Sequence, residues 1–407
     1  MGIIVQKYGG SSVADVERIR AVAGRVIEEV DNGHQVVVVV SAMGKTTDKL
    51  LKMVAEITER PDPREVDMLL STGEQVTISM LAIMLQSMGR KAVSMTGPQV
   101  GILTDSAHRR ARIRSINAET MKKALNKGKV VIVAGFQGAT DDGEITTLGR
   151  GGSDTTAVAL AAALKADRCD IYTDVDGVYT TDPRVVPTAR KLKSITYDEM
   201  LELASLGAKV LHSRSVELAK NFNVPLQVLS SFNHEPGTMV VKEYHMMEDI
   251  VVSGVAFNRN EAKISILGVP DTPGMAAKLF GCLGATAVDV IIQNVAADDR
   301  NDISFTVNRD ELVQARELSE KFAAEVGARG VTTDDDIGKV SVVGVGMKSH
   351  SGVAAVMFDA LAKQGINIEQ ITTSEIKISV VIRRGDIDRA VQAIHEAFEL
   401  SDEPAGK

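Results

Sequence analysis

Six short runs rich in Val and Ile recur through the first 232 residues, and longer segments with helical patterning separate them. The runs are 3–7, 35–41, 91–96, 129–134, 169–173 and 226–230. Several are apolar at consecutive positions, which is typical of strands covered on both faces. The pattern predicts an α/β fold with a mainly parallel central sheet sandwiched by helices. Ligands of such sheets bind beyond the carboxyl ends of the strands, so the loops there are the first candidates for a site.

The C-terminal third contains two copies of one unit. The segment KISILGV at 263–269 is echoed by KVSVVGV at 339–345, and ISFTV at 303–307 by ISVVI at 378–382. Each copy has the order strand, helix, strand, strand, helix, which is the split βαβ pattern of ferredoxin-like modules. A duplicated scaffold without a ligand is an open alternative. We expect a first domain at 1–233, a linker at 234–248, the two repeated units and a tail at 401–407.

Composition and charge exclude several classes of protein. The chain has 407 residues, of which 44% are hydrophobic and 25% charged, as in soluble globular proteins of two or three domains. A net charge of −8 gives no general attraction to nucleic acid or to an anionic membrane. There is no leader pattern and no apolar run of bilayer length. We therefore expect a cytoplasmic protein that binds neither nucleic acid nor membrane.

The cysteines and histidines do not suggest a metal or redox site. Cys169 and Cys282 are too few for a disulfide framework, and we interpret both as buried small apolar residues. The seven histidines form no HExxH motif and do not pair with cysteine at metal-ligand spacing. We predict no metal site built from protein ligands.

Two glycine-rich loops precede helical segments. One is KYGGSS at 7–12, after the first strand, and the other is TLGRGGSD at 147–154, which runs into the apolar segment TTAVALAAALKA. The first N–H groups of a helix lack intrahelical partners, and the helix dipole favours anions there. Lys7 could neutralise a transferring phosphoryl group while main-chain amides hold its oxygens. Each loop alone could be an ordinary capped turn, but the two together predict a phosphate site.

Three further segments are less specific. Gly44-Lys45-Thr46 looks like the end of a P-loop, but Val39 stands where that motif requires glycine, so we reject this interpretation. Glu74 lies in an apolar helical stretch and could receive a substrate ammonium group, although a cap or a surface salt bridge is equally open. The segment YTDVDGVYTTDPR at 172–184 has the groups of a nucleotide pocket, but it also fits a hydrophilic hairpin.

Taken together, these motifs resemble those of one enzyme family, the aspartate kinases, which have the amino-acid kinase fold. The shared motifs are KYGGSS, VSAMGKTTD, STGEQ, TLGRGGSD, YTDVDGVYTTDPR and GAKVLHSRSVELA. DTPGMAA, IIQN, MKSHSGVA and INIEQITTSEIKIS resemble the tandem ACT domains of the same enzymes. The likeness covers almost the whole chain. It implies ATP-dependent phosphorylation of the β-carboxylate of L-aspartate, the first step of lysine, threonine and methionine biosynthesis.

The resemblance also implies roles for individual residues. Lys7 would stabilise charge on the moving phosphoryl group with the amides of Gly9 and Gly10, and Asp154 would orient Lys7. Arg150 would grip the substrate α-carboxylate with its guanidinium fork. The other aspartate-side positions are Ser41, Thr47, Glu74, Gly152 and Ser153. The ATP-side positions are Thr173, Asp174, Tyr179, Asp182, Arg184 and Lys209. Mg²⁺ would bridge the phosphates, with mainly water and phosphate as ligands.

The ACT pair implies feedback inhibition by lysine, threonine or both, bound between ACT units. Asp271, Thr272, Gly274, Met275 and Ala276 would form one wall of the site, with Ile292, Gln293 and Asn294 opposite. The matching positions of the second unit are Ser351, Val353, Asn367, Ile368, Thr373 and Ser374. Family precedent interleaves the units, which gives ACT domain 1 at 262–334 and ACT domain 2 at 249–261 plus 335–400. We expect a homo-oligomer formed through the ACT domains, and a further hypothesis is an internally initiated C-terminal subunit that starts near Met247.

Two other functions remain open at this point. The chain could be an amino-acid-sensing regulatory protein with an inactive kinase domain, or a sister amino-acid kinase that acts on another carboxylate. The joint presence of Lys7, Glu74, Arg150 and Asp154 favours an active aspartate kinase, because a regulatory protein has no chemical need for the full set.

Overall fold

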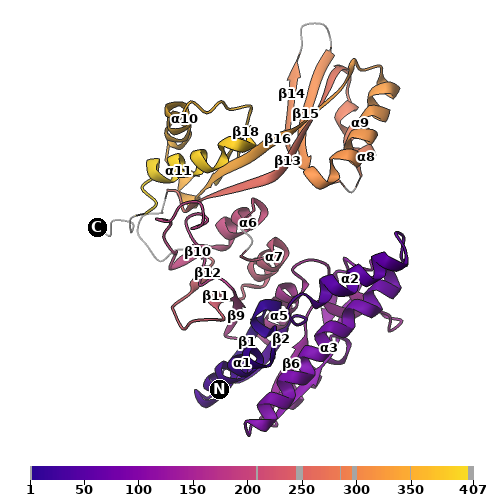
Figure 1. Cartoon of the computed structure of the whole chain (residues 1–407), viewed down its shortest axis with the longest axis vertical. Coiled ribbons are helices and arrows are strands. Elements are labelled where there is room, and N and C mark those ends of the chain that lie inside the picture. Colours follow the sequence, from indigo (N-terminus) through magenta and orange to yellow (C-terminus); the bar gives the residue numbers. More distant parts are fainter. Residues whose placement is uncertain are drawn as a thin grey trace. The chain divides into compact units, whose positions relative to one another are not determined.

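The computed structural model describes residues 2–207, 210–243, 251–284, 286–295, 300–348 and 350–401. The chain divides into two compact units (Figure 1). The first comprises Met1–Val178, Lys191–Ser205 and Lys209–Met247, and the second comprises Tyr179–Arg190, Leu206–Ala208 and Glu248–Lys407.

An eight-stranded sheet forms the centre of the first unit, in the order β10-β12-β11-β9-β1-β2-β6-β3. Every neighbouring pair is parallel except β11 with β12. The strands are β1 (Ile3–Tyr8), β2 (Gln35–Val40), β3 (Ala92–Met95), β6 (Val130–Ala134), β9 (Arg168–Thr173), β10 (Ser194–Thr196), β11 (Leu226–Ser230) and β12 (Thr238–Val241). The predicted fold class, a mainly parallel sheet between helices, is confirmed.

Helices cover both faces of this sheet. Val36, Val38 and Val40 of β2 pack in one core with α1 (Val16–Asp31) and α3 (Pro63–Ser87). Strand side chains alternate between faces, so Val37 and Val39 point to the other side. There, α5 (Gly152–Leu164) contacts β1, β2 and β9. The remaining helices of this unit are α2 (Thr46–Ile57), α4 (Glu119–Leu125), α6 (Tyr197–Ser205) and α7 (Ser213–Phe222).

The long helix α3 is a core helix. By length and composition alone it could cross a membrane, but half of its most apolar stretch is buried inside the protein. It starts with Asp62 as N-cap, whose side chain accepts a hydrogen bond from Arg64 N, and with Pro63 in the first turn. Asp67, in its second turn, and Glu74, near its middle, are buried and are hydrogen-bonded to other segments of the unit.

Several short strands were not expected. A second sheet of the first unit has the order β5-β4-β7-β8, formed by β4 (Ile102–Thr104), β5 (Ile113–Ile116), β7 (Gln137–Ala139) and β8 (Ile145–Thr147). The segment 234–248, which we expected to be a linker, contributes β12 to the main sheet. Backbone hydrogen bonds to β11 and β10 and the buried side chain of Val240 hold it there. Met247 lies outside the described residues.

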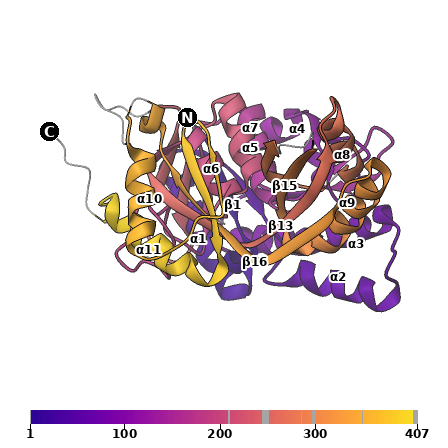
Figure 2. The same cartoon turned by 90° about the horizontal axis from the view of Figure 1, so that it is seen from above.

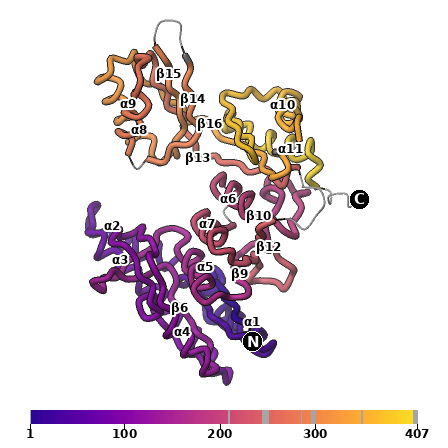
Figure 3. Tube along the Cα trace, turned by 180° about the vertical axis from the view of Figure 1, so that it is seen from behind, coloured from indigo at the N-terminus to yellow at the C-terminus, as the bar shows by residue number. Residues whose placement is uncertain are grey.

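The second unit contains one six-stranded antiparallel sheet in the order β14-β15-β13-β16-β18-β17. Its helices α8 and α9 lie together beside β15 (Figure 3), and α10 lies against α11 (Figure 2). The strands are β13 (Gly254–Pro270), β14 (Val288–Val295), β15 (Arg300–Asn308), β16 (Gly330–Val343), β17 (Gln370–Thr373) and β18 (Lys377–Arg383). The helices are α8 (Met275–Leu283), α9 (Leu312–Val326), α10 (Val353–Lys363) and α11 (Ile387–Ala397).

The long strands β13 and β16 run through both halves of this sheet. Residues 254–258 of β13 pair with 339–343 of β16 and pack in the core that contains α10 and α11. Residues 263–267 pair with 330–334 and belong to the core that contains α8 and α9. The two repeated units are thus joined by shared strands.

One expectation about the cysteines is wrong. Cys169 in β9 is buried, but Cys282 in α8 is exposed. The core-facing positions of that part of α8 are Leu279 and Leu283, so Cys282 lies away from the core.

A buried ion cluster lies in the six-stranded sheet of the second unit, where the half that packs on α8 and α9 meets the half that packs on α10 and α11. Lys339 in β16 is 2% exposed, and its Nζ lies 3.1 Å from Glu261 Oε1 in β13. The same ammonium group contacts Asp289 in β14. Glu261 also accepts a hydrogen bond from Asn258 Nδ2 at 2.9 Å. Removing the cation would therefore leave a buried carboxylate without its counter-charge.

We predict that Lys339→Met lowers the free energy of unfolding by about 3 kcal/mol, because Glu261 then stays buried and unpaired. The double variant Lys339→Met, Glu261→Leu should recover most of this loss. Urea denaturation followed by circular dichroism measures both. Lys363→Met is the control, since its pair with Asp359 on α10 is exposed and should contribute less than about 1 kcal/mol. Equal losses in the single and double variants would contradict the explanation.

Candidate active site

The two glycine-rich loops predicted to hold phosphate meet at one ion pair. Lys7 Nζ lies 2.6 Å from Asp154 Oδ1, and the two side chains are only 11% and 12% exposed. Lys7 comes from the carboxyl end of β1, and Asp154 comes from the first turn of α5. The structure thus brings a cation to the N-terminus of a helix, which is the combination that favours an anion, and a carboxylate holds that cation in place.

The alternation of side chains along β1 explains why Lys7 reaches α5. Tyr8 packs in the core under α1 and α3, where its ring stacks on Tyr172 with the centroids 4.5 Å apart. Lys7 therefore points to the opposite face, which α5 covers. Gly9 and Gly10 follow directly, and the carbonyl group of Gly10 accepts a hydrogen bond from Gly44 N at 2.9 Å. The KYGGSS loop is thereby fixed to the loop after β2.

The start of α5 requires glycine. Gly151 is the N-cap residue and has a φ of 68°, a left-handed conformation that favours glycine. A Cβ atom at this position would lie 2.2 Å from the ring of His212. Burial lowers the pKa of His212, and the nearby Asp154 opposes this effect. The His212 ring therefore closes one side of the loop that leads to Gly152 and Asp154.

The loop after β2 connects α5 with α3. Ser41 Oγ donates a hydrogen bond to Ser153 Oγ at 2.9 Å, and Ala42 N donates one to Glu74 Oε1 at 3.2 Å. Residues of β1, β2, α3 and α5 thus converge beyond the carboxyl ends of the parallel strands. Thr47 lies in the first turn of α2, six residues after Ser41, and it is half-buried.

Glu74 is the most perturbed acid of this group. It is 2% exposed, and its Oε2 atom has no hydrogen-bond partner among the described residues. Burial raises the pKa of Glu74 from 4.5 to about 7, because hydrogen bonds from the backbone of Glu74 itself and of Ala42 offset only part of the loss of hydration. Such a carboxyl group is suited to receive a cation, since a positive partner would restore its ionised form.

The other predicted substrate and nucleotide positions lie in different parts of the chain, and one of them is not described by the structure. Arg150 is exposed in the loop before α5. Thr173 ends β9, the strand next to β1, and its Oγ1 donates a hydrogen bond of 3.0 Å to Oδ1 of Asp174, the following residue. Of the remaining ATP-side positions, Tyr179, Asp182 and Arg184 belong to the second compact unit, and Lys209 lies outside the described residues. Arg184 forms an ion pair with Asp182, at 2.7 Å, which lowers the pKa of Asp182.

Three residues near the site were missed by the sequence analysis. They are Asp67 in α3, together with His212 and Arg214 at the start of α7, and all three contact the segment 147–151 or the loop beside it. His212 and Arg214 stand in the quoted motif GAKVLHSRSVELA, so that motif was the available signal. Asp67 carried no signal of its own, because a single Asp in an apolar helix has many possible roles.

A cavity of about 280 Å³ in the second unit contains most of the effector positions predicted for ACT domain 1. Asp271, Thr272, Gly274, Met275, Ala276 and Gln293 line it, together with Asn301 of β15. Asn301 Nδ2 donates a hydrogen bond to Asp271 Oδ1 at 2.7 Å. Ile292 and Asn294 are not among the lining residues. Side chains alternate along β14, so the neighbours of Gln293 point to the other face, where Ile292 packs near Val290.

The second copy of the repeat reproduces part of this arrangement. Val353 begins α10 after Gly352, whose φ of 98° matches the 95° of Gly274 before α8. Ser351 lies in the turn before α10, and Asn367 and Ile368 lie between α10 and β17. Thr373 ends β17, and Ser374 N donates a hydrogen bond to the carbonyl group of Lys377 at 2.8 Å.

We predict that Glu74→Gln reduces the pH dependence of stability. The folded-state pKa of about 7 exceeds the value of 4.5, so the protonated form contributes stability that is complete below pH 4.5 and is lost as the pH rises through about 7. The Gln variant should match the wild type at pH 4.5 and exceed it by about 3 kcal/mol at pH 8. Urea denaturation of the ligand-free proteins tests this. Glu56→Gln, on the exposed side of α2, is the control, and parallel wild-type and Glu74→Gln profiles would refute the prediction.

Comparisons with known proteins agree on one family. Residues 2–230 match the model of the amino acid kinase family, and residues 340–398 match an ACT domain model. The chain is 57% identical to the aspartate kinase of Pseudomonas putida over 408 residues, which covers 100% of this chain and 99% of that protein.

Two solved structures are similar over nearly the whole chain. E. coli aspartokinase III in complex with aspartate and ADP (R-state) aligns with a TM-score of 0.81 and 26% identity, covering 97% of this chain and 99% of that one. The same E. coli enzyme in complex with lysine and aspartate (T-state) aligns with a TM-score of 0.76 at the same identity and coverage. The chain therefore belongs to the amino acid kinase family and, within it, to the aspartate kinases.

Proposed function

We propose that this chain transfers the γ-phosphoryl group of ATP to the β-carboxylate of L-aspartate and forms 4-phospho-L-aspartate. The observation that carries the proposal is the buried contact of Lys7 with Asp154 at the junction of two glycine-rich loops. The aspartate and ADP complex of the similar E. coli enzyme supports this choice of substrates.

In this reaction the protein would act by positioning and by charge stabilisation. The β-carboxylate of aspartate is ionised at neutral pH, so the nucleophile needs no general base. Lys7 would hold its ammonium group at the phosphoryl group as negative charge shifts towards the leaving oxygen, and Asp154 would fix the direction of Lys7. The backbone of Gly9 and Gly10 would lie along the phosphates.

The described residues fit the phosphates of a nucleotide, but they do not form a set of protein ligands for its metal ion. A buried lysine beside a helix N-terminus suits phosphate oxygens. Within the described ranges no three His, Cys, Asp or Glu side chains gather where they could hold a metal ion. Mg²⁺ would therefore be held mainly by phosphate and water, and when bound it would neutralise charge on the phosphate oxygens.

The charged ends of the substrate would be held by different segments. Glu74, which lacks a partner at Oε2, would receive the α-ammonium group, and this contact would return Glu74 to the carboxylate form. Arg150 would bind the α-carboxylate through its guanidinium fork. Ser41, Thr47, Gly152 and Ser153 would complete the aspartate side, and Thr173, Asp174, Tyr179, Asp182, Arg184 and Lys209 the nucleotide side.

We predict that Lys7→Met lowers kcat by 100-fold or more, on the order of an oxyanion-hole deletion. Arg150→Ala should lower kcat/KM for aspartate by about 100-fold and change KM for ATP less than about twofold, because only the carboxylate contact is lost. Trapping of the acyl phosphate with hydroxylamine measures both. Lys220→Met, which breaks an exposed ion pair with Asp198 on the surface of α7, is the control.

The same assay discriminates the alternative functions when it is run on wild-type protein with aspartate, glutamate and acetylglutamate. Hydroxamate from another carboxylate but not from aspartate would indicate a sister kinase. Absence of product from all three would favour a regulatory protein.

We also propose that an end-product amino acid inhibits the enzyme from the cavity in the second unit. The N-terminus of α8 at Gly274 would face the carboxylate of the ligand, and Asp271 would accept its ammonium group. The lysine complex of E. coli aspartokinase III makes lysine the first candidate, with threonine as the second. The matching positions Ser351, Val353, Asn367, Ile368, Thr373 and Ser374 would serve a second effector site.

Association of several copies fits this proposal. The end strands β14 and β17 carry Ile291 and Ile371, which are 52% and 44% exposed. Unpaired strand edges with apolar side chains favour pairing between chains, so we propose a homo-oligomer formed through the ACT domains. We also propose a cytoplasmic location, which fits the composition of the chain.

We predict that Asp271→Ala raises the lysine concentration for half-inhibition at least about tenfold, because the ammonium group loses its charged partner. Activity without lysine should be unchanged. Inhibition curves with lysine, threonine and an equimolar mixture provide the measurement. Glu317→Ala, at an exposed position of α9, is the matched control, and an unaltered lysine curve in Asp271→Ala would assign the effector to another site.

A further inference from the structure

Asp67, a buried carboxylate outside the proposed catalytic group, lies at the base of the loop that carries Arg150. We propose that Asp67 is a positioning residue that sets the affinity for aspartate by fixing the backbone from which Arg150 extends. This inference rests on the proposed function, since it concerns the substrate contact assigned there to Arg150. It adds a determinant of substrate affinity that lies below the site and does not touch the substrate.

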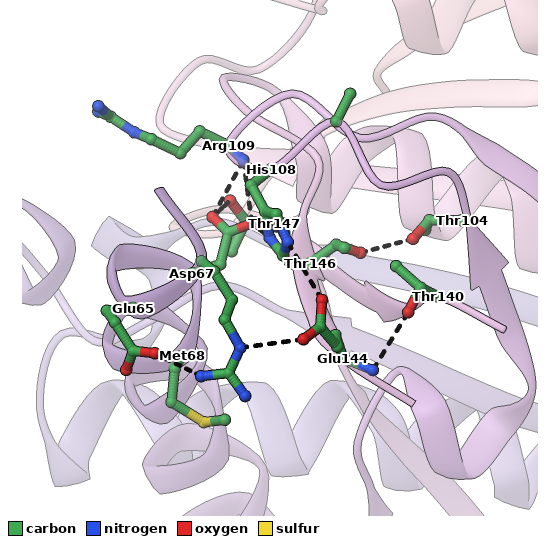
Figure 4. Close-up of polar contacts among 12 residues, drawn as sticks. Glu65, Asp67, Met68, Thr104, His108, Arg109, Thr140, Glu144, Thr146 and Thr147 are labelled. Carbon is green, nitrogen blue, oxygen red and sulfur yellow. Dashed lines mark hydrogen bonds and ion pairs between the residues drawn. The ribbon is translucent and has the colours of Figure 1, made fainter. Parts of the chain in front are cut away.

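Asp67 collects hydrogen bonds from two separate segments (Figure 4). It is fully buried in α3, seven residues and two helical turns before Glu74. Thr147 donates twice, from its N to Oδ2 at 3.0 Å and from its Oγ1 to Oδ1 at 2.5 Å. From the loop before β5, Arg109 N donates to Oδ2 at 2.9 Å, and His108 Nδ1 lies 3.0 Å from Oδ2. One side chain thus joins α3, the end of β8 and the loop 105–112.

The first route from Asp67 to Arg150 runs along the chain. Thr147 ends β8 and stands three residues before Arg150. The next backbone groups are also held, because Ala111 N donates to the Thr147 carbonyl at 2.9 Å and Leu148 N donates to the Phe136 carbonyl at 2.8 Å. Arg214 donates to the carbonyl groups of Leu148 and Ala111, each at 2.9 Å. Every backbone polar group from Thr147 N to the Leu148 carbonyl is therefore paired.

The second route passes through the backbone of Arg109. This residue has a φ of 67°, which is uncommon for a residue with a side chain and persists only when the surroundings hold it. Asp67 supplies such a hold at Arg109 N. The carbonyl oxygen of Arg109 lies 2.9 Å from the point where a Cβ atom on Gly149 would stand. Arg109 therefore packs directly against the residue that precedes Arg150.

Arg150 depends on this support because its own side chain has little. It is exposed, and among the described residues it makes no ion pair or hydrogen bond that would fix the guanidinium group. The backbone at 147–149 then sets the point from which the Arg150 side chain extends. A clamp on that backbone reduces the freedom that must be lost when the substrate carboxylate binds, and this raises affinity.

The chemistry of a carboxylate is needed at this position. The N–H groups of Thr147 and Arg109 and the hydroxyl group of Thr147 all point at its two oxygens, which together offer about four acceptor sites. Asparagine has the same shape, but its NH₂ group would face at least one of these donors. Asp67→Asn should thus loosen the clamp without leaving a cavity.

The test compares steady-state kinetics of Asp67→Asn and Thr147→Val with those of the wild-type enzyme. KM for aspartate should rise about tenfold or more in Asp67→Asn and about threefold in Thr147→Val, which loses the hydroxyl donor but keeps its N–H. KM for ATP should change less than about twofold in both. If Asp67→Asn does not fold, Thr147→Val decides the question alone.

A matched control separates positioning from general stability. Thr104 Oγ1 and Thr146 Oγ1 form a buried hydrogen bond of 2.6 Å between β4 and β8, within the same small sheet. Thr104→Val removes this bond without touching Asp67 or Thr147 side-chain contacts. It should lower Tm and leave KM for aspartate unchanged. A rise in KM as large as that of Thr147→Val would show that any loosening of this sheet suffices, and would overturn the inference.

A double-mutant cycle then asks whether Asp67 acts through Arg150. In an Arg150→Ala background, Asp67→Asn should have almost no further effect on kcat/KM for aspartate, because the group that it positions is gone. Multiplicative losses would overturn the inference. Wild-type protein that produces no hydroxamate from aspartate would overturn the proposed function itself, whereas normal wild-type turnover with an unchanged KM in Thr147→Val and Asp67→Asn would overturn only the role of Asp67.

Discussion

The contact between Lys7 and Asp154 depends on the register of a single strand. Along β1 the side chains of Lys7 and Tyr8 point to opposite faces, so Lys7 reaches α5 only while Tyr8 stays stacked on Tyr172 beneath α1 and α3. A shift of one residue would bury the lysine in an apolar core and turn the tyrosine to the face that α5 covers. The packing of the core and the placement of Lys7 are therefore one constraint, and the parallel pairing of β1 with β2 and β9 enforces it.

Two buried charges of the active site are balanced in different ways. Lys7 already has its counter-ion in Asp154, so the pair is preformed before any ligand binds. Glu74 has no positively charged partner among the described residues; it accepts a hydrogen bond from Ala42 N, and burial raises its pKa to about 7. In the roles proposed for them, Lys7 and Asp154 form a preformed phosphate end, and Glu74 forms a substrate end that still needs a cation. This asymmetry fits a reaction in which the amino acid completes the electrostatics of the pocket on arrival.

The sequence predicts an element where burial on both faces produces a long run of apolar residues. It does not predict the elements and site residues that depend on a few contacts between distant segments. The consecutive Val and Ile residues of β1, β2 and β6 could be recognised because both faces of these strands are covered. The strands β4, β7 and β8 have only three residues each, too few to show a period. The role of Asp67 could not be predicted for a related reason, since its hydrogen-bond partners at 108–109 and 147 are distant in sequence. In β14, alternation places Gln293 at the cavity and leaves its neighbours Ile292 and Asn294 off the lining, a difference that a contiguous motif does not reveal.

The two repeats of the second unit have the same order of strands and helices, but they differ in the turn that would bind an effector. Both α8 and α10 begin after a left-handed glycine, Gly274 or Gly352, so the helix N-terminus is common to both. In the first repeat the sequence of this turn contains Asp271, which is hydrogen-bonded to Asn301, whereas in the second repeat the turn sequence is two residues longer and contains no carboxylate. A carboxylate beside a helix N-terminus complements both ends of a free amino acid, and only the first repeat offers this combination in its turn. Since β13 and β16 run through both halves, a ligand that favours one turn acts on strands that both units share.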